Sequence, residues 1–121
     1  MYETWQSSYD EIVADGLIDL HFRGLPDIEY LKEIFNQHKD SGGCLLIIDD
    51  LIQSIDESVT SIFTIYSHHL NVTCILLVQS LFLSSKEYRT ISLNANYIIL
   101  MKSVRNSSAV TQLAKQTHPY R

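Results

Sequence analysis

The chain is poor in the residues that mark several large classes of protein. It has two cysteines and two prolines, and no apolar run approaches the roughly 20 residues that cross a bilayer. We therefore expect neither a disulfide framework nor a membrane-spanning helix. Cys44 and Cys74 both lie in apolar stretches, which suits reduced thiols in an intracellular, reducing compartment. No G-x-S-x-G pattern occurs, so covalent hydrolase chemistry has no support.

Composition and charge describe one globular unit with two unlike halves. Hydrophobic residues make up 45% of the chain and charged residues 19%, which predicts a single domain over residues 1–121. Residues 1–57 carry three Lys or Arg against thirteen acids, a net charge of −10, whereas residues 58–121 carry six against one, a net charge of +5. This asymmetry suits head-to-tail packing of identical subunits or a basic face turned towards phosphate. A folded dipole without a partner is the simpler alternative.

The most informative stretch runs from Cys44 to Leu51, where four consecutive apolar residues precede Asp49 and Asp50. An apolar run without alternation predicts a strand buried on both faces, as in parallel sheets covered by helices. Open α/β sheets bind ligands at the carboxyl ends of their strands. Paired acids at that end are typical of a Walker B element, in which one carboxylate holds magnesium and the next positions the attacking water. A solvated acidic loop is the alternative interpretation.

The rest of the chain alternates between helical and strand patterns. Helical spacing predicts helices within 2–15, from Ile28 to Lys39 behind an Asp27 cap, from Ser54 or Asp56 to His69, from Ser84 towards Leu93, and after Ser107 or Ser108. Further strand patterns cover Leu17–Phe22, Thr73–Val78 and Tyr97–Met101. The connections are long enough for right-handed crossovers, so we predict an α/β fold with a mainly parallel sheet.

A parallel sheet would bring several polar residues to one edge, because its strands all end there. The edge would gather Asp49, Asp50, Gln79, Lys102 and Arg105. Two acids, one amide and two cations suit a magnesium-bound phosphate, with Gln79 as a sensor that orients water or reads a γ-phosphate. An ordinary polar strand end is the alternative for Gln79.

Two arginines are candidates for a role between subunits. Arg89 and Arg105 lie in loop or helix contexts, from which one could act as an arginine finger on a neighbouring subunit's phosphate. A solvated surface arginine is the alternative for each.

Two other chemistries fit the sequence poorly. Adjacent helical residues such as His68 and His69 point about 100° apart, and no Cys or acid lies at a matching spacing for zinc. A phospho-receiver domain needs an acceptor aspartate at a central strand end, where this chain has Gln79 and Ser80.

The run from Gly24 to Pro119 resembles the genome-packaging ATPases of Maverick/Polinton elements and related double-stranded DNA viruses, in the FtsK–HerA branch of P-loop ATPases. The residues that carry the likeness are Gly24–Pro26, Leu45–Leu51, Ser67–Asn71, Val78–Phe82, Arg89–Ala95, Ile98–Arg105 and Leu113–Gln116. The resemblance implies a three-layer sandwich of P-loop NTPase type. It also implies ATP and Mg²⁺ as cofactors, bound through Asp49 and Asp50, with Gln79 as sensor and Arg89 or Arg105 acting across a subunit boundary.

The chain departs from that family in one respect. No G-x-x-x-x-G-K-[ST] occurs in it, so the Walker A loop, with its strand and helix, is missing. Without that loop no run of backbone N–H groups cradles the β- and γ-phosphates, and we expect very weak or absent hydrolysis by this chain alone. We interpret Met1 as the start of a fragment or remnant gene product.

The resemblance implies a fragment of a DNA-packaging ATPase that forms homo-oligomers or joins full-length ATPase subunits. Double-stranded DNA and capsid components would be its further partners, in the nucleus or at the site of virion assembly. The alternative is a non-catalytic module that binds and modulates full-length subunits. Removal of the Walker A strand also predicts that Ile75–Val78 and Ile98–Met101 either pair directly or promote self-association through exposed edges.

Overall fold

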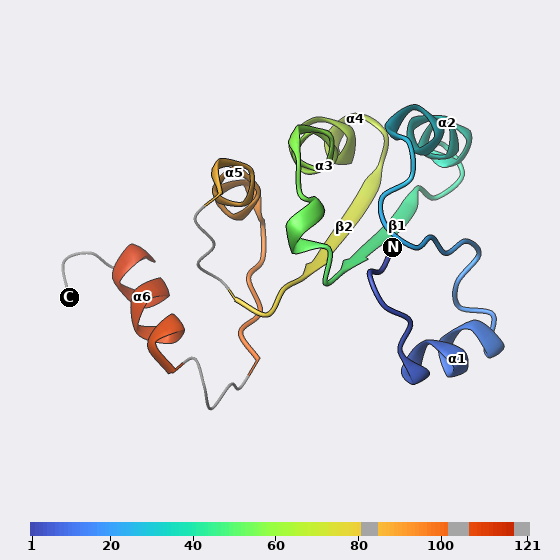
Figure 1. Cartoon of the computed structure of the whole chain (residues 1–121). Helices are drawn as coiled ribbons and strands as arrows, with labels where there is room; N and C mark the ends of the chain where they lie inside the picture. The colour runs from blue at the N-terminus through green and yellow to red at the C-terminus, as the bar shows by residue number, and fades with distance from the viewer. Residues whose placement is uncertain (81–84, 102–106, 118–121) are drawn as a thin grey trace.

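A parallel sheet of two strands lies at the centre of the computed structural model (Figure 1). The structure describes residues 1–80, 85–101 and 107–117. The elements in chain order are α1 (Ser7–Ala14), α2 (Ile28–His38), β1 (Cys44–Asp49), the 3₁₀-helix η1 (Ile52–Ser54), α3 (Glu57–Ser61), the π-helix η2 (Ile62–Tyr66), α4 (Ser67–His69), β2 (Val72–Leu77), α5 (Lys86–Asn94) and α6 (Ser107–Thr117). The chain is therefore a mixed α/β protein, as the sequence predicts. None of its described helices has the length and apolar character needed to span a membrane.

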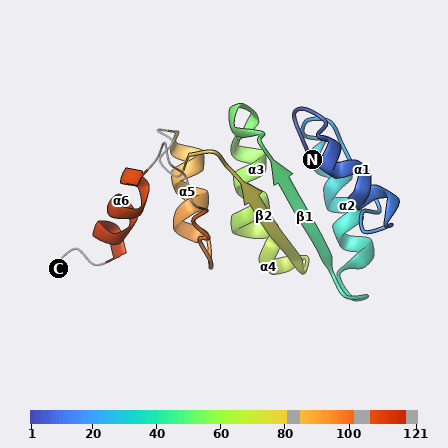
Figure 2. The ribbon, with the colours of Figure 1, turned by 90° about the horizontal axis from the view of Figure 1, so that it is seen from below.

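The register of the two strands decides where the polar residues meet. β1 and β2 run parallel, with Cys44 opposite Val72 and Asp49 opposite Leu77. The chain between them passes through α3, η2 and α4, which form the helical crossover that parallel strands require. Figure 2 shows both arrowheads pointing the same way. The carboxyl ends of β1 and β2 consequently share one edge of the sheet.

Side-chain caps begin the helices at the predicted places. Asp27 Oδ1 accepts hydrogen bonds from the backbone N–H groups of Glu29 and Tyr30, at 2.8 and 3.4 Å, at the start of α2. Asp56 Oδ1 accepts from the N–H groups of Ser58 and Val59 at the start of α3. These bonds satisfy donors that the first turn of a helix leaves free.

The cap of α5 lies one residue later than predicted. Ser85 Oγ accepts from the backbone N–H of Tyr88 at 3.1 Å, whereas the predicted cap Ser84 lies outside the described residues. The Ser-x-x-Glu spacing therefore located the helix but not its first residue.

The crossover helix contains a π turn, for which the sequence provides a physical reason. Four hydroxyl side chains donate to the carbonyl oxygen four residues earlier, at 2.8–3.0 Å: Thr60 to Asp56, Ser61 to Glu57, Thr64 to Thr60, and Ser67 to Phe63. Hydroxyls that bond in this way compete for the carbonyls of the regular helical ladder and often bend helices. The π-helix Ile62–Tyr66 lies within this hydroxyl-rich stretch.

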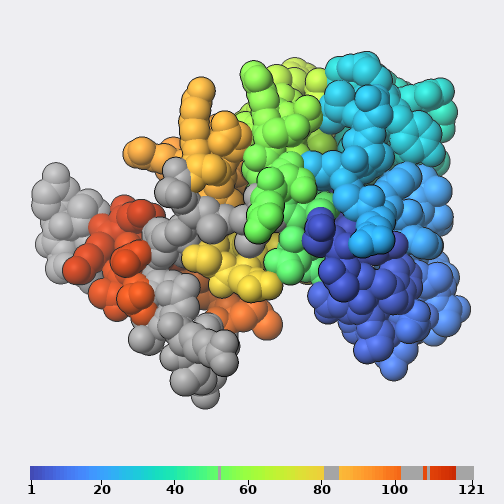
Figure 3. Space-filling view, viewed as in Figure 1, coloured from blue at the N-terminus to red at the C-terminus, as the bar shows by residue number. Residues whose placement is uncertain are grey.

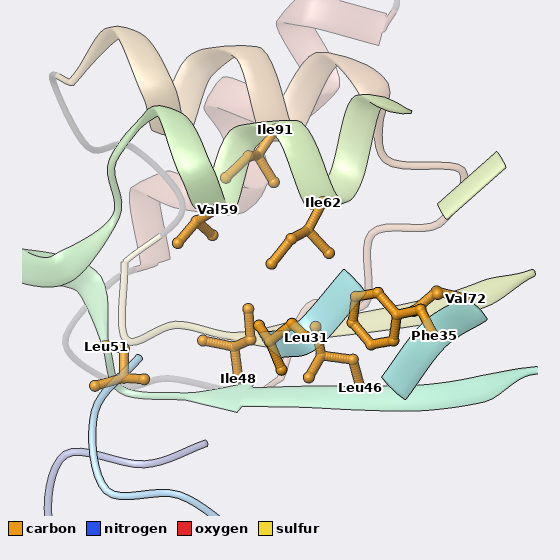
Figure 4. Close-up of a cluster of buried hydrophobic side chains, with 9 residues drawn as sticks. All are labelled: Leu31, Phe35, Leu46, Ile48, Leu51, Val59, Ile62, Val72 and Ile91. Carbon is orange, nitrogen blue, oxygen red and sulfur yellow. The ribbon is translucent and has the colours of Figure 1, made fainter. Parts of the chain in front are cut away.

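The apolar core lies on one face of the sheet, beneath α2, α3, η2 and α5. Nine buried hydrophobic side chains form it: Leu31, Phe35, Leu46, Ile48, Leu51, Val59, Ile62, Val72 and Ile91 (Figure 4). The prediction that β1 is buried on both faces is wrong. Leu46 and Ile48 are buried, but Leu45 and Ile47 between them are exposed on the other face, as are Ile75 and Leu77 of β2. An apolar run shows that every side chain is hydrophobic, but a side chain is buried only where another element covers it. No described element covers Leu45 and Ile47 on the second face.

Two of the predicted strands do not form. Leu17–Phe22 is irregular, and the bridges at this side of the sheet are single parallel pairs of Tyr2 with Arg23 and with Asp49. Tyr97–Met101 is also irregular and pairs with no described strand. Both segments have strand-like side chains, but a strand exists only when a neighbouring backbone supplies its hydrogen bonds.

Candidate functional site

The carboxyl edge of the sheet brings together two of the polar residues predicted from sequence. Asp50 directly follows β1, and Gln79 lies two residues beyond the end of β2. Gln79 Nε2 donates to both carboxylate oxygens of Asp50, at 3.1 Å to Oδ1 and 3.2 Å to Oδ2. The parallel register thus joins side chains that are 29 residues apart in the chain.

The backbone at Asp50 turns sharply out of the strand. Its φ angle is +56°, in the left-handed region where Asp and Asn are the commonest residues after glycine. Its backbone N–H approaches the Leu77 carbonyl at 3.4 Å, which continues the pairing of β1 with β2 by one position. This turn leaves the Asp50 side chain exposed at the edge, beside Gln79.

Asp49 faces a different neighbour. Side chains alternate along β1, so Asp49 lies on the face opposite Leu46 and Ile48, where the Tyr9 hydroxyl of α1 donates to Asp49 Oδ2. Burial raises the pKa of Tyr9 to about 12, together with its hydrogen bond to Asp49 and the negative charges of Asp49 and Asp50. One lone pair of the predicted magnesium ligand is therefore occupied by a phenol. Sequence reasoning missed this contact because nothing in the local pattern relates residues 40 positions apart.

The segment before α2 holds Tyr9 in place. Asp49 N–H donates to the Met1 carbonyl at 3.0 Å, and Gly24 N–H donates to the Tyr2 carbonyl at 2.8 Å. An aromatic cluster then packs around Trp5, with ring centroids 5.2 Å from Tyr2, 5.4 Å from Tyr9 and 5.3 Å from His21. Figure 3 shows the N-terminal segment in dark blue, packed against the rest of the molecule. The cluster keeps α1 over Asp49.

A small hollow opens at this edge. Its volume is about 220 Å³, and Gln6, Asp49, Asp50, Leu77, Val78 and Gln79 line it. Ligand pockets for drug-sized molecules usually measure about 300–1,000 Å³, so this hollow suits a hydrated cation or a phosphate better than a whole nucleotide. A wider depression of about 570 Å³ is lined by residues of α2 alone and offers no convergent groups from a second element.

The remaining predicted site residues do not join this cluster. Arg89 is exposed on α5 and forms no ion pair with Asp49 or Asp50. Lys102 and Arg105 lie outside the described residues. His68 and His69 are exposed at the end of α4, and no three His, Cys, Asp or Glu residues gather as a metal site within residues 1–80, 85–101 and 107–117. The described site is thus Asp49, Asp50 and Gln79, with Tyr9 above it.

Comparison with known proteins identifies no relative: no family model, curated protein or solved structure matches this chain.

The contact between Tyr9 and Asp49 predicts a specific loss of stability in alkali. The folded chain keeps the Tyr9 proton up to a pKa of about 12, whereas the unfolded chain releases it near 10. The stabilisation from the neutral phenol is therefore complete below pH 10 and disappears as the pH rises from 10 to 12. Solvent screens this interaction, because the ring is partly exposed. Between pH 10 and 12 we therefore expect the free energy of unfolding of the wild type to fall by about 1 kcal/mol more than that of Tyr9→Phe.

Urea unfolding of the wild type and of Tyr9→Phe across this pH range measures the difference. Tyr30→Phe, which removes a hydroxyl from an exposed side chain on α2, is the matched control. Parallel pH profiles for wild type and Tyr9→Phe would show that the Tyr9 hydroxyl does not bond Asp49.

Proposed function

We propose that this chain is a packaging-ATPase-like α/β domain that retains the Walker B and sensor strands without the phosphate loop. The observation that supports the proposal is the pair of hydrogen bonds from Gln79 Nε2 to the two carboxylate oxygens of Asp50, at the shared carboxyl edge of adjacent parallel strands. The parent fold would be a P-loop NTPase-like three-layer sandwich with a wider parallel sheet. Its activity would be ATP-driven translocation of double-stranded DNA by a ring of identical subunits.

The geometry suggests a separate role for each residue. Asp49 is the candidate ligand for a magnesium ion, which prefers one or two carboxylates together with phosphate oxygens and water. Asp50 would accept a proton from, or orient, an attacking water. Gln79 would be a positioning residue, because its hydrogen bonds to both oxygens fix the orientation of the Asp50 carboxylate. The carboxylate oxygens of Asp49 and Asp50 fit such a cation, because each has lone pairs beyond those used by Tyr9 and Gln79. Bound magnesium would neutralise charge on the phosphate oxygens.

The missing phosphate loop limits what the chain can do alone. Backbone N–H groups and a lysine normally hold the β- and γ-phosphates, and this chain has no Walker A sequence that would supply them. We therefore expect no measurable turnover of ATP. Full-length ATPase subunits, further copies of this chain, double-stranded DNA and capsid components are the partners that the proposal implies.

A second function, a non-catalytic module that binds and modulates full-length subunits, is favoured by one observation. The Tyr9 hydroxyl already occupies Asp49, and the hollow beside it is smaller than a nucleotide site. In this alternative the acidic edge is a structural remnant, and binding to full-length subunits uses the charged faces of the chain, negative over residues 1–57 and positive over residues 58–121.

Titration with a magnesium complex of a non-hydrolysable ATP analogue separates the two functions. The fluorescence of Trp5, which is the only tryptophan and contacts Tyr9, reports the titration. If the site is retained, Asp49→Asn should weaken binding at least tenfold, about 1.4 kcal/mol. Asp40→Asn, which removes an exposed acid between α2 and β1, should leave the affinity unchanged.

Two results of this titration would contradict the nucleotide function or the role of Asp49. Equal affinity of the wild type and Asp49→Asn would remove Asp49 from the site. Undetectable binding by the wild type would exclude the nucleotide function and leave the interaction module.

A further inference from the structure

The outer edge of β2 presents unpaired backbone groups. The carbonyl oxygens of Asn71 and Leu77 point towards β1. The Asn71 carbonyl accepts from Cys44 N–H at 3.0 Å, and the Leu77 carbonyl accepts from Asp50 N–H at 3.4 Å. Alternate residues of a parallel strand face the same neighbour, so the N–H and C=O groups of Val72, Cys74 and Leu76 point away from β1. In the described part of the chain no strand pairs with this side of β2. Free strand edges of this kind readily pair with another chain.

A second segment has side chains suited to a strand but no partner strand among the described residues. Exposure alternates along Tyr97–Met101: Tyr97 is 88%, Ile98 42%, Ile99 82%, Leu100 39% and Met101 82% exposed. A period of two is characteristic of extended chain with one side turned inward. Figures 1 and 2 show this segment after α5, on the far side of β2 from β1. Tyr97, Ile99 and Met101 are therefore left largely in solvent, whereas Ile98 and Leu100 are more than half covered.

The total exposed surface is larger than a compact monomer requires. The accessible surface is 9090 Å², whereas a compact monomer of 13.9 kDa is expected to expose about 6,700 Å². The surplus of about 2,400 Å² is similar to the area that one copy buries in a large obligate homodimer, about 1,000–2,500 Å². Exposed apolar side chains of β2 and of Tyr97–Met101 contribute to this surplus.

We propose that two copies of this chain associate by reciprocal strand addition, with residues 97–101 of each copy pairing along the free edge of β2 in the other. A twofold axis makes the two contacts equal, so the β2 edge and residues 97–101 of both copies are used. The added backbone hydrogen bonds satisfy Val72, Cys74 and Leu76, and the contact buries the apolar side chains of both segments.

A second copy fits this edge well because the chain itself provides both complementary parts. Neither Val72–Leu77 nor Tyr97–Met101 contains a charged residue, so identical copies do not repel there despite the net charge of −5. The edge also lacks the lysine or proline that commonly protects edge strands. The proposal does not depend on nucleotide binding, because Asp49, Asp50 and Gln79 take no part in it.

Sedimentation or light scattering across a range of concentrations tests the association. We expect a dimer of about 28 kDa, twice the 13.9 kDa chain. Ile99→Lys should weaken dimerisation at least tenfold, because it places a charge in the new strand. The matched control is Leu93→Lys on α5, where an equally exposed apolar side chain lies outside the contact. Circular dichroism verifies that both variants keep the fold.

Amide hydrogen exchange locates the contact. The amides of Val72, Cys74 and Leu76 should gain at least tenfold protection in the dimer and lose it in Ile99→Lys. A monomer at every concentration would refute the proposal. A dimer that Ile99→Lys does not weaken, or one that leaves these three amides unprotected, would refute it equally, since association would then use another surface.

Discussion

Replacing Gly43 by alanine should destabilise the fold by about 2–5 kcal/mol, the sum of a left-handed backbone and a steric clash. Gly43 has a φ angle of +82°, and it directly precedes β1. A Cβ atom there would collide with the carbonyl oxygen of Asn71 and come within 2.7 Å of Asn71 Cγ. The same carbonyl accepts the Cys44 N–H, so relief of the clash would break the first hydrogen bond between β1 and β2.

Gly16→Ala is the matched control for this substitution. Gly16 has a similar φ angle of +67°, but no atom lies within 4 Å of the position its Cβ would take. Its loss should therefore be the backbone cost alone, about 1–2 kcal/mol. Urea unfolding of both variants gives the comparison. Equal losses would mean that Asn71 moves aside without cost and that the start of the sheet is less closely packed than described.

Ile48→Ala should lower the free energy of unfolding by about 3–5 kcal/mol. Ile48 is 0% exposed and lies at the centre of the core, so the removed atoms leave a cavity that the sheet and the helices packed on it cannot close. That loss is a large share of a typical domain stability of about 5–15 kcal/mol.

The neighbouring residue provides the control. Ile47 is 38% exposed on the other face of β1, so Ile47→Ala should cost less than about 1.5 kcal/mol. Urea midpoints of the two variants test the one-sided core directly. Similar losses at both positions would contradict it, because they would require a layer of packed side chains on the second face as well.

Local signals predicted the elements that depend on local chemistry. Asp27 and Asp56 cap helices where their positions suggested, and the apolar runs that form β1 and β2 are strands. The acidic edge followed from topology, because parallel strands separated by a helical crossover must end together. Gln79 meets Asp50 for that reason.

Features that depend on distant partners could not be predicted in the same way. Tyr97–Met101 has the composition of β2, yet it is not a strand, because no described backbone lies beside it to complete its hydrogen bonds. Leu45 and Ile48 differ little as residues but lie on opposite faces, one exposed and one buried. The contact of Tyr9 with Asp49 joins α1 to β1, and no periodic pattern in the sequence indicates it, because the two residues are 40 positions apart.

The alignment of Asp49 with Leu77 has a consequence for how the polar edge and the apolar layer depend on each other. A shift of β2 by a single residue would carry Gln79 about 3.3 Å along the strand and turn it to the opposite side. The same shift would exchange Leu76 for Leu77 as the side chain that faces the helices. Mutations that loosen the apolar core and let β2 shift would therefore also move the Gln79 amide away from Asp50, even if they lie far from either carboxylate.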